Sequence, residues 1–78
     1  MQEQIKNLIK SILKSENINE IGIDESLLDL GLDSIKTIEL VVELEDCFDI
    51  EVDQDDLIID NFTTISKIME LVNRYINV

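Results

Sequence analysis

Apolar residues recur with helical spacing in three segments of this chain. In residues 2–15 the positions with this spacing are Ile5, Leu8, Ile9, Ile12 and Leu13. The i, i+3, i+4, i+7 and i+8 pattern is typical of an amphipathic helix with one buried face. Residues 64–76 follow the same rule, and Thr63 or Thr64 is placed to cap that helix at its start. We therefore predict amphipathic helices over residues 2–15 and 64–76.

The third segment, residues 34–48, carries two apolar stripes on one predicted helix. One stripe consists of Leu40, Val41, Leu44 and Phe48, and the other of Ile35, Ile38 and Val42. A helix that is apolar all round is usually buried on every side, so both stripes could lie in the core. Acidic residues flank the second stripe, however, and a chain of 78 residues has little material to cover it. We expect the first stripe to face the core and the second to face a partner.

The connections are predicted from their turn residues. Residues 16–33 hold both glycines and many apolar side chains, so we expect a long ordered loop packed over the helices, with a helical turn near residues 24–28. Asp53 is followed by further acids and resembles an N-cap with a negative first turn, which predicts a short helix over residues 53–59. The predicted fold class is all-α, in a single domain over residues 1–78.

The charge balance narrows the range of partners. The chain holds 18 acidic and 6 basic residues, and from Asp24 to Asp60 the only basic residue is Lys36. Nucleic acid and anionic membranes are also negative, so we expect neither as a partner, and a partner with a basic surface is favoured. The alternative is that the acidic region is simply a solvated surface.

The single cysteine and the absence of a secretory or transmembrane run predict a cytoplasmic protein. Cys47 itself lies among acids that disfavour its thiolate, and we expect a partly buried small side chain there.

Catalytic chemistry fits this composition poorly. The chain has no histidine, so Ser34 lacks the base of a Ser-His-Asp triad, and Asp33 beside it is placed to cap a helix instead. The acids from Asp49 to Asp60 have offsets like those of a calcium-binding loop. Gln54 stands where that loop needs its turn glycine, so we expect no true metal site.

One serine follows a glycine-containing turn and opens a predicted helix. The residues around it are Leu30-Gly31-Leu32-Asp33-Ser34-Ile35, with Ile38-Glu39-Leu40 shortly after. Farther along, the chain reads Leu44-Glu45, then Phe48-Asp49-Ile50-Glu51-Val52, then Phe62-Thr63-Thr64-Ile65. In this order these residues resemble the acyl carrier protein family over nearly the whole chain.

The resemblance implies an acyl-carrier-like four-helix bundle and a 4′-phosphopantetheine arm. A phosphopantetheinyl transferase would take the arm from coenzyme A and join it to Ser34 through a phosphodiester, with Asp33 as the helix cap beside it. A helix N-terminus favours such a phosphate. The arm's thiol would carry acyl groups as thioesters to acyl-transferring and ketosynthase-type enzymes of fatty-acid or polyketide-type biosynthesis.

The resemblance also implies a non-catalytic, monomeric phosphoprotein that docks through its helix over residues 34–48. The residues expected on the docking face are Ile35, Lys36, Ile38, Glu39, Val42, Glu45 and Asp46. The acyl chain could lie between the opposite stripe of that helix and the inner faces of the first and last helices.

The residues beside the serine depart from the pattern of fatty-acid carriers. Ile35 and Lys36 stand where those carriers commonly have Leu-Asp, and Leu32 stands where many have alanine, which looks closer to polyketide-type or other specialised carriers. A peptidyl or aminoacyl carrier is less favoured, because Leu32-Asp33 stands where Gly-His or Gly-Asp is usual. An acidic interaction module without a prosthetic group, and a small calcium-responsive protein, are the alternatives of another class.

Overall fold

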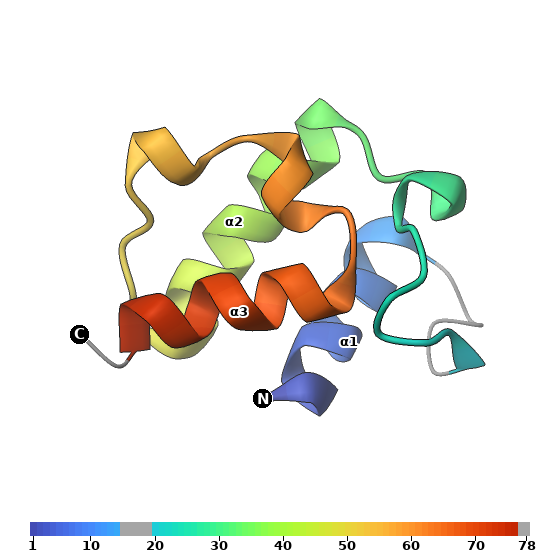
Figure 1. Ribbon diagram of the computed structural model, residues 1–78, viewed down its shortest axis with the longest axis horizontal. Coiled ribbons are helices and arrows are strands. Elements are labelled where there is room, and N and C mark those ends of the chain that lie inside the picture. Colours follow the sequence, from blue (N-terminus) through green and yellow to red (C-terminus); the bar gives the residue numbers. More distant parts are fainter. Residues whose placement is uncertain (15–19, 77–78) are drawn as a thin grey trace.

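Three α-helices and three short 3-10 turns form the computed structural model, which describes residues 1–14 and 20–76 (Figure 1). In chain order the elements are α1 (Gln2–Leu13), η2 (Leu28–Leu30), α2 (Ser34–Phe48), η3 (Gln54–Asp56), η4 (Ile59–Phe62) and α3 (Ile65–Ile76). These described residues contain no β-strand. The predicted all-α, acyl-carrier-like fold class is confirmed.

Left-handed residues end α1 and α2, and a threonine caps the start of α3. α1 ends at Leu13 because Lys14 adopts a left-handed conformation with φ 54°, two residues earlier than predicted. α2 ends in the same way at Asp49, also with φ 54°, whose N–H donates to the carbonyl of Glu45. At the start of α3, Thr64 Oγ1 accepts the N–H of Lys67 at 3.1 Å, as its predicted capping position requires.

The predicted helix over residues 53–59 is wrong as a single element. Two 3-10 turns, η3 and η4, take its place, and the backbone at Ile58 between them is extended (φ −116°, ψ 142°). The carbonyl of Asp56 accepts from the side-chain amide of Asn61 at 2.9 Å instead of extending a helix. The break lets η4 turn inward, so that Phe62 is fully buried.

Part of the predicted loop over residues 16–33 lies outside the described residues, and the described part packs down as expected. Leu27 is fully buried, and its N–H donates to the carbonyl of Thr63 at 2.7 Å. Ser66 N–H donates to the carbonyl of Ile23 at 2.8 Å, which ties the loop to the start of α3. The helical turn expected near residues 24–28 occurs instead at η2.

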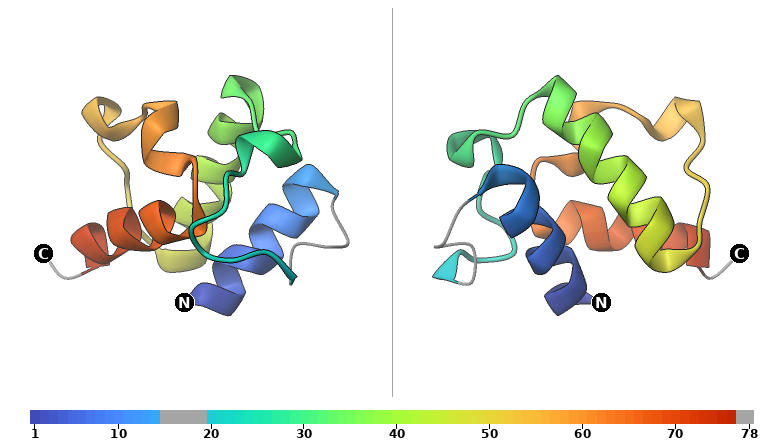
Figure 2. Two further views of the ribbon diagram at one scale, coloured as in Figure 1. Left: turned by 45° about the vertical axis from the view of Figure 1, so that its right-hand side comes forward. Right: turned by 180° about the vertical axis from the view of Figure 1, so that it is seen from behind.

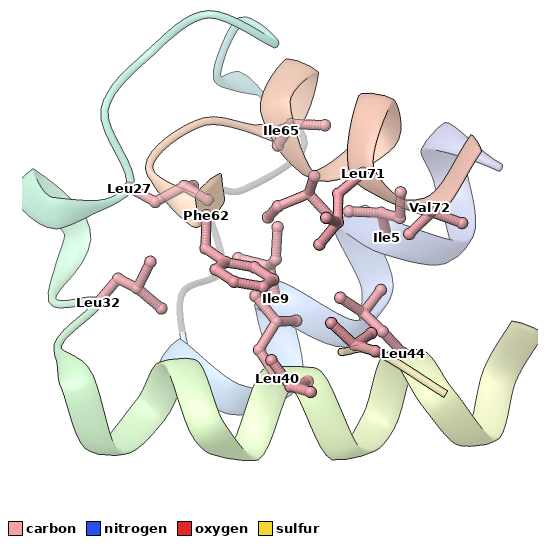
Figure 3. Packing of buried hydrophobic residues seen from close by; sticks show 13 residues of the cluster. Ile5, Ile9, Leu27, Leu32, Leu40, Leu44, Phe62, Ile65, Leu71 and Val72 are labelled. Atoms are coloured by element: carbon pink, nitrogen blue, oxygen red, sulfur yellow. The ribbon is translucent and has the colours of Figure 1, made fainter. Parts of the chain in front are cut away.

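The core is enclosed by the three helices, the loop before α2 and the connection after it. Figure 2 shows α1 lying against α2, and Figure 3 shows the buried side chains meeting between α2 and the other elements. The thirteen buried apolar residues are Ile5, Ile9, Leu27, Leu32, Leu40, Val41, Leu44, Val52, Phe62, Ile65, Ile68, Leu71 and Val72. Burial of this aliphatic cluster holds the N-terminal end of α2 in a fixed position.

Candidate functional site

Ser34 is the first residue of α2, and the turn before it leaves its hydroxyl free. Asp33 is extended (φ −136°, ψ −175°), and its Oδ1 accepts the N–H of Lys36 at 2.8 Å, which is the N-cap geometry expected of it. The carbonyl of Asp33 accepts both the N–H and the Oγ1 hydroxyl of Thr37, at 2.8 and 2.7 Å. Because Asp33 provides the cap, the exposed Ser34 hydroxyl is not needed to cap the helix.

The lead-in to Ser34 is held rigidly. Gly31 has φ 106°, a left-handed conformation that strains other residues, and its N–H donates to the carbonyl of Leu28 at 3.1 Å. A Cβ atom at Gly31 would meet nothing within 4 Å, so the backbone angle rather than space favours glycine. The next residue, Leu32, is buried and anchors the turn in the core.

The first turn of α2 presents an anchored hydroxyl beside backbone donors. The first N–H groups of a helix have no partner within the helix, and the Asp33 cap occupies that of Lys36. The N–H groups of Ser34 and Ile35 remain on this turn, where the helix dipole also favours negative charge. A phosphate ester on Ser34 would therefore find donors beside it and open solvent in front.

The two faces of α2 differ as the two predicted stripes require. Leu40 and Leu44 are fully buried, and Val41 is nearly so. On the outer stripe, exposed fractions are 71% for Ile35, 67% for Ile38 and 51% for Val42. The alternative that both stripes lie in the core is excluded.

The charged residues predicted on the docking face differ in how far they are exposed to solvent. Glu39 and Asp46 are exposed, and Lys36 is half-buried. Glu45 is also half-buried, and its Oε2 accepts the N–H of Val52 at 3.0 Å. The carboxylate of Glu45 therefore contacts the connection after α2, where the chain turns back at Asp49, and the place of Glu45 on the docking face stays a prediction.

An apolar cavity of about 310 Å³ lies beside Ser34. Its walls are Ser34, Thr37, Ile38, Val41, Val42 and Glu45 on α2, and Leu57 and Ile59 on the connection between α2 and α3. The cavity therefore lies between α2, including Val41 of the inner stripe, and the connection that follows it, and none of its wall residues belongs to α1 or α3. The apolar run Leu57-Ile58-Ile59 within an acidic segment was the sequence signal for this wall.

Exposed side chains on the connection extend the apolar surface of α2. Leu57 and Ile58 are both exposed, and Leu57 lines the cavity together with Ile38 and Val42 of the outer stripe. Cys47 is exposed as well, so the expectation of a partly buried side chain is wrong. It lies on α2 between the buried and the outer stripe, where no described segment covers it.

Two of the acidic residues near η3 have structural roles at the ends of helical elements. Asp53 caps η3 by accepting the N–H of Asp55 at 3.1 Å, and Asp49 is the left-handed residue that ends α2. Among the residues described, no group of three or more Asp, Glu, His or Cys side chains is arranged to hold a metal ion. None of the helices in the described residues has the length and apolar character needed to cross a membrane.

Comparison with known proteins identifies the class to which this site belongs. A family model described as "Phosphopantetheine attachment site" matches residues 3–72. The acyl carrier protein of Desulforapulum autotrophicum is 29% identical over 75 residues, covering 95% of each chain. The acyl carrier protein of Streptomyces coelicolor is 37% identical over 67 residues, covering 85% of this chain and 71% of the relative.

A second kind of relative is also similar. The D-alanyl carrier protein of Streptococcus sanguinis is 43% identical over 63 residues, covering 80% of this chain and 78% of the relative. All these proteins are carriers, and the family model spans nearly the whole sequence. The chain therefore belongs to the acyl carrier protein family. Its prosthetic group is a covalently attached 4′-phosphopantetheine, and the exposed hydroxyl and free N–H groups at the start of α2 fit such a group.

Proposed function

We propose that this chain is a non-catalytic carrier whose 4′-phosphopantetheine arm is joined to the Ser34 hydroxyl. The observation that supports this most strongly is the capped first turn of α2, where Asp33 satisfies the helix and leaves Ser34 exposed. In the modification, the serine oxygen forms a bond to the phosphate of the arm, the remainder of coenzyme A leaves, and the serine proton is lost. When attached, the arm supplies a terminal thiol that holds cargo as a thioester.

The proposed cargo is an acyl intermediate of fatty-acid or polyketide-type biosynthesis. The cavity beside Ser34 supports this assignment, because its walls are mainly aliphatic and a fatty acyl group gains free energy when it leaves water. The similarity to D-alanyl carrier proteins of streptococci supports a second candidate, an aminoacyl carrier loaded with D-alanine. The two candidates require different loading enzymes, so a panel of purified loading enzymes separates them.

We further propose that partner enzymes dock on the outer face of α2. Ile35, Ile38 and Val42 offer exposed apolar area beside Ser34, and Glu39 and Asp46 are exposed acids next to it. An enzyme surface with an apolar centre and basic rim would match both properties. Because acids at the rim mainly speed encounter, such complexes form and separate rapidly, as a carrier that visits several enzymes requires.

Modification of Ser34 is tested by intact mass. Wild-type protein incubated with coenzyme A, magnesium and a broad-specificity phosphopantetheinyl transferase should gain one phosphopantetheine. The Ser34→Ala variant should gain none, and its helical circular dichroism should match that of the wild type. No gain in the wild type, or a gain that persists in Ser34→Ala, would refute the assignment.

The docking face is tested by charge reversal on α2. Glu39→Lys should raise the KM of the transferase for this chain by about fivefold, equivalent to about 1 kcal/mol, because it reverses the sign of a rim charge. Glu70→Lys makes the same change in charge on α3, and its exposed side chain is away from the outer face of α2. Equal effects of the two substitutions would mean that only net charge matters, and the docking assignment would be wrong.

A further inference from the structure

The hydroxyl of Tyr75 joins the end of α3 to η3. It accepts the N–H of Asp53 at 2.9 Å and donates to the Oδ2 carboxylate oxygen of Asp56. Tyr75 is 22 residues from Asp53 and 19 from Asp56 in the chain. A single side chain thus bonds both the residue that caps η3 and the residue that ends it.

Few other interactions hold η3 in place. None of its three residues is buried, so no apolar side chain of η3 anchors it in the core. Asp53 Oδ1 accepts the N–H of Asp55 within the turn, and Asn61 Nδ2 donates to the carbonyl of Asp56 at 2.9 Å from the side of η4. The buried Val52, directly before Asp53, anchors the start of this segment, and the two hydrogen bonds of Tyr75 connect η3 itself to α3.

The position of η3 also sets one wall of the cavity beside Ser34. Leu57 follows Asp56 directly, and Leu57 and Ile59 face the α2 residues across the cavity. Figure 1 shows this connection rising from the end of α2 and running back above α3 to η4. A shift of η3 would therefore move the Leu57 side of the cavity, at some distance from Tyr75 itself.

We propose that Tyr75 is a positioning residue for the arm and its cargo, acting through η3 on the Leu57–Ile59 wall of the cavity. The inference rests on the proposed attachment at Ser34. With the hydroxyl present, the wall stays against α2 and an apolar group on the arm is sheltered between them. Without it, η3 separates from α3, the wall moves, and the same group meets water.

The test compares four variants with the wild type in the full chain. Tyr75→Phe removes only the hydroxyl, and Asp56→Ala removes its carboxylate partner. Asp56→Asn keeps an oxygen that can accept the hydroxyl hydrogen, so it should rescue the contact. Asn73→Ala is the matched control, because Asn73 is exposed on α3 two residues before Tyr75.

The first measurement is amide hydrogen exchange of residues 53–58 in the unmodified protein. Tyr75→Phe and Asp56→Ala should accelerate exchange there by up to about tenfold, because each removes a hydrogen bond and even a bond to a neutral acceptor can contribute about that factor. Asp56→Asn and Asn73→Ala should stay near the wild type. Exchange at Leu40 and Ile68 reports on the whole core and should change little in any variant.

The second measurement uses an arm that carries a small apolar solvatochromic fluorophore, transferred from a coenzyme A analogue. Emission should shift toward its value in water in Tyr75→Phe and Asp56→Ala, but not in Asp56→Asn or Asn73→Ala. The double variant Tyr75→Phe with Asp56→Ala should shift no farther than Tyr75→Phe alone, because the loss of the hydroxyl already removes the contact with Asp56.

The outcomes separate this proposal from the proposed function. If the wild type accepts no arm, the attachment at Ser34 is wrong and the effect on cargo fails with it. If the arm is accepted but emission is the same in all variants, Tyr75 has no positioning role. Unchanged exchange in residues 53–58 of Tyr75→Phe would overturn the contact between Tyr75 and η3 in either case.

Discussion

Asp33 caps the first turn of α2, and the adjacent Ser34 is left without a capping role. Asp33 uses its side chain for Lys36 and its carbonyl for Thr37, which completes the first turn of α2. A serine at the start of a helix often serves as the cap itself. Because the preceding aspartate takes that role here, the Ser34 hydroxyl stays available for a covalent bond. The unusual neighbours Ile35 and Lys36 do not disturb this arrangement, since both follow the cap.

The hydrogen bonds of the Tyr75 hydroxyl predict how its pKa differs from that of a free tyrosine. The hydrogen bond to the Asp56 carboxylate is the main cause that raises the pKa of Tyr75 above its ordinary value of 10.0, and desolvation adds to it, whereas the bond from Asp53 N–H opposes it. The folded state thus holds this proton more tightly than the unfolded chain. The contribution of the Tyr75 hydroxyl to the free energy of unfolding is therefore fully present below about pH 10. It is lost as the pH rises through the raised pKa of Tyr75.

Near-ultraviolet absorbance of tyrosinate measures this pKa directly, because the chain has one tyrosine and no tryptophan. The midpoint should lie above 10.0 in folded protein and fall to about 10 in urea. The difference in unfolding free energy between the wild type and Tyr75→Phe should shrink above about pH 10. A midpoint below 10.0 in the folded protein would contradict the contact with Asp56.

At the scale of elements, α2 is a helix with two apolar faces and two tasks. Leu40 and Leu44 join the core with α1 and α3, whereas Ile35, Ile38 and Val42 stay at the surface beside Ser34. The division keeps the proposed attachment site, Ser34, on a helix whose inner face is anchored in the core. An apolar outer face also has a cost, because it favours association with other apolar surfaces, and the acids beside it oppose self-association by repulsion.

The two faces should respond differently to truncation. Leu44→Ala should lower the free energy of unfolding by about 2–5 kcal/mol, because it leaves a cavity in the core. Ile38→Ala, on the same helix, should change it by about 0.5 kcal/mol or less, since its side chain is largely exposed. Urea unfolding followed by circular dichroism measures both. Equal losses would show that the outer stripe is buried in solution.

At the scale of the whole molecule, a net charge of −12 on 78 residues opposes folding through self-repulsion. The basic residues lie mostly in α1 and α3, so the negative potential is concentrated on α2 and its connections. That distribution would attract a partner with a basic surface to the side of the molecule that carries Ser34. It also makes the stability of the fold depend on ionic strength.

Added sodium chloride should raise the melting temperature by several degrees, because screening weakens repulsion among the acids. Glu43→Lys provides the matched test, since Glu43 is exposed on α2. This variant should melt higher than the wild type at low salt and gain less from added salt. Calorimetry in which the wild type shows no rise with salt would refute this explanation.

Local spacing predicts most of the fold and the core of the site. The periods of residues 2–15, 34–48 and 64–76 depend on neighbours three or four residues away. All three segments form helices whose predicted inner faces are largely buried, although Phe48 is only half-buried and Ile76 is exposed. The Asp33 cap can also be predicted from the sequence, because its partner Lys36 is only three residues away. The segment 53–59 shows the limit: its acids and apolar run are compatible with one helix, but Asn61 and Tyr75 bond its backbone and side chains from outside.

Local patterns in the sequence therefore predict the three α-helices, the two-faced character of α2 and the exposed serine after a capping aspartate, because each follows from residues close together in the chain. The fold, in contrast, brings Glu45 to Val52, places Leu57 and Ile59 in a cavity wall with α2, and lets Tyr75 bond η3. Those features require segments distant in sequence to meet, and their meeting is set by how the core packs.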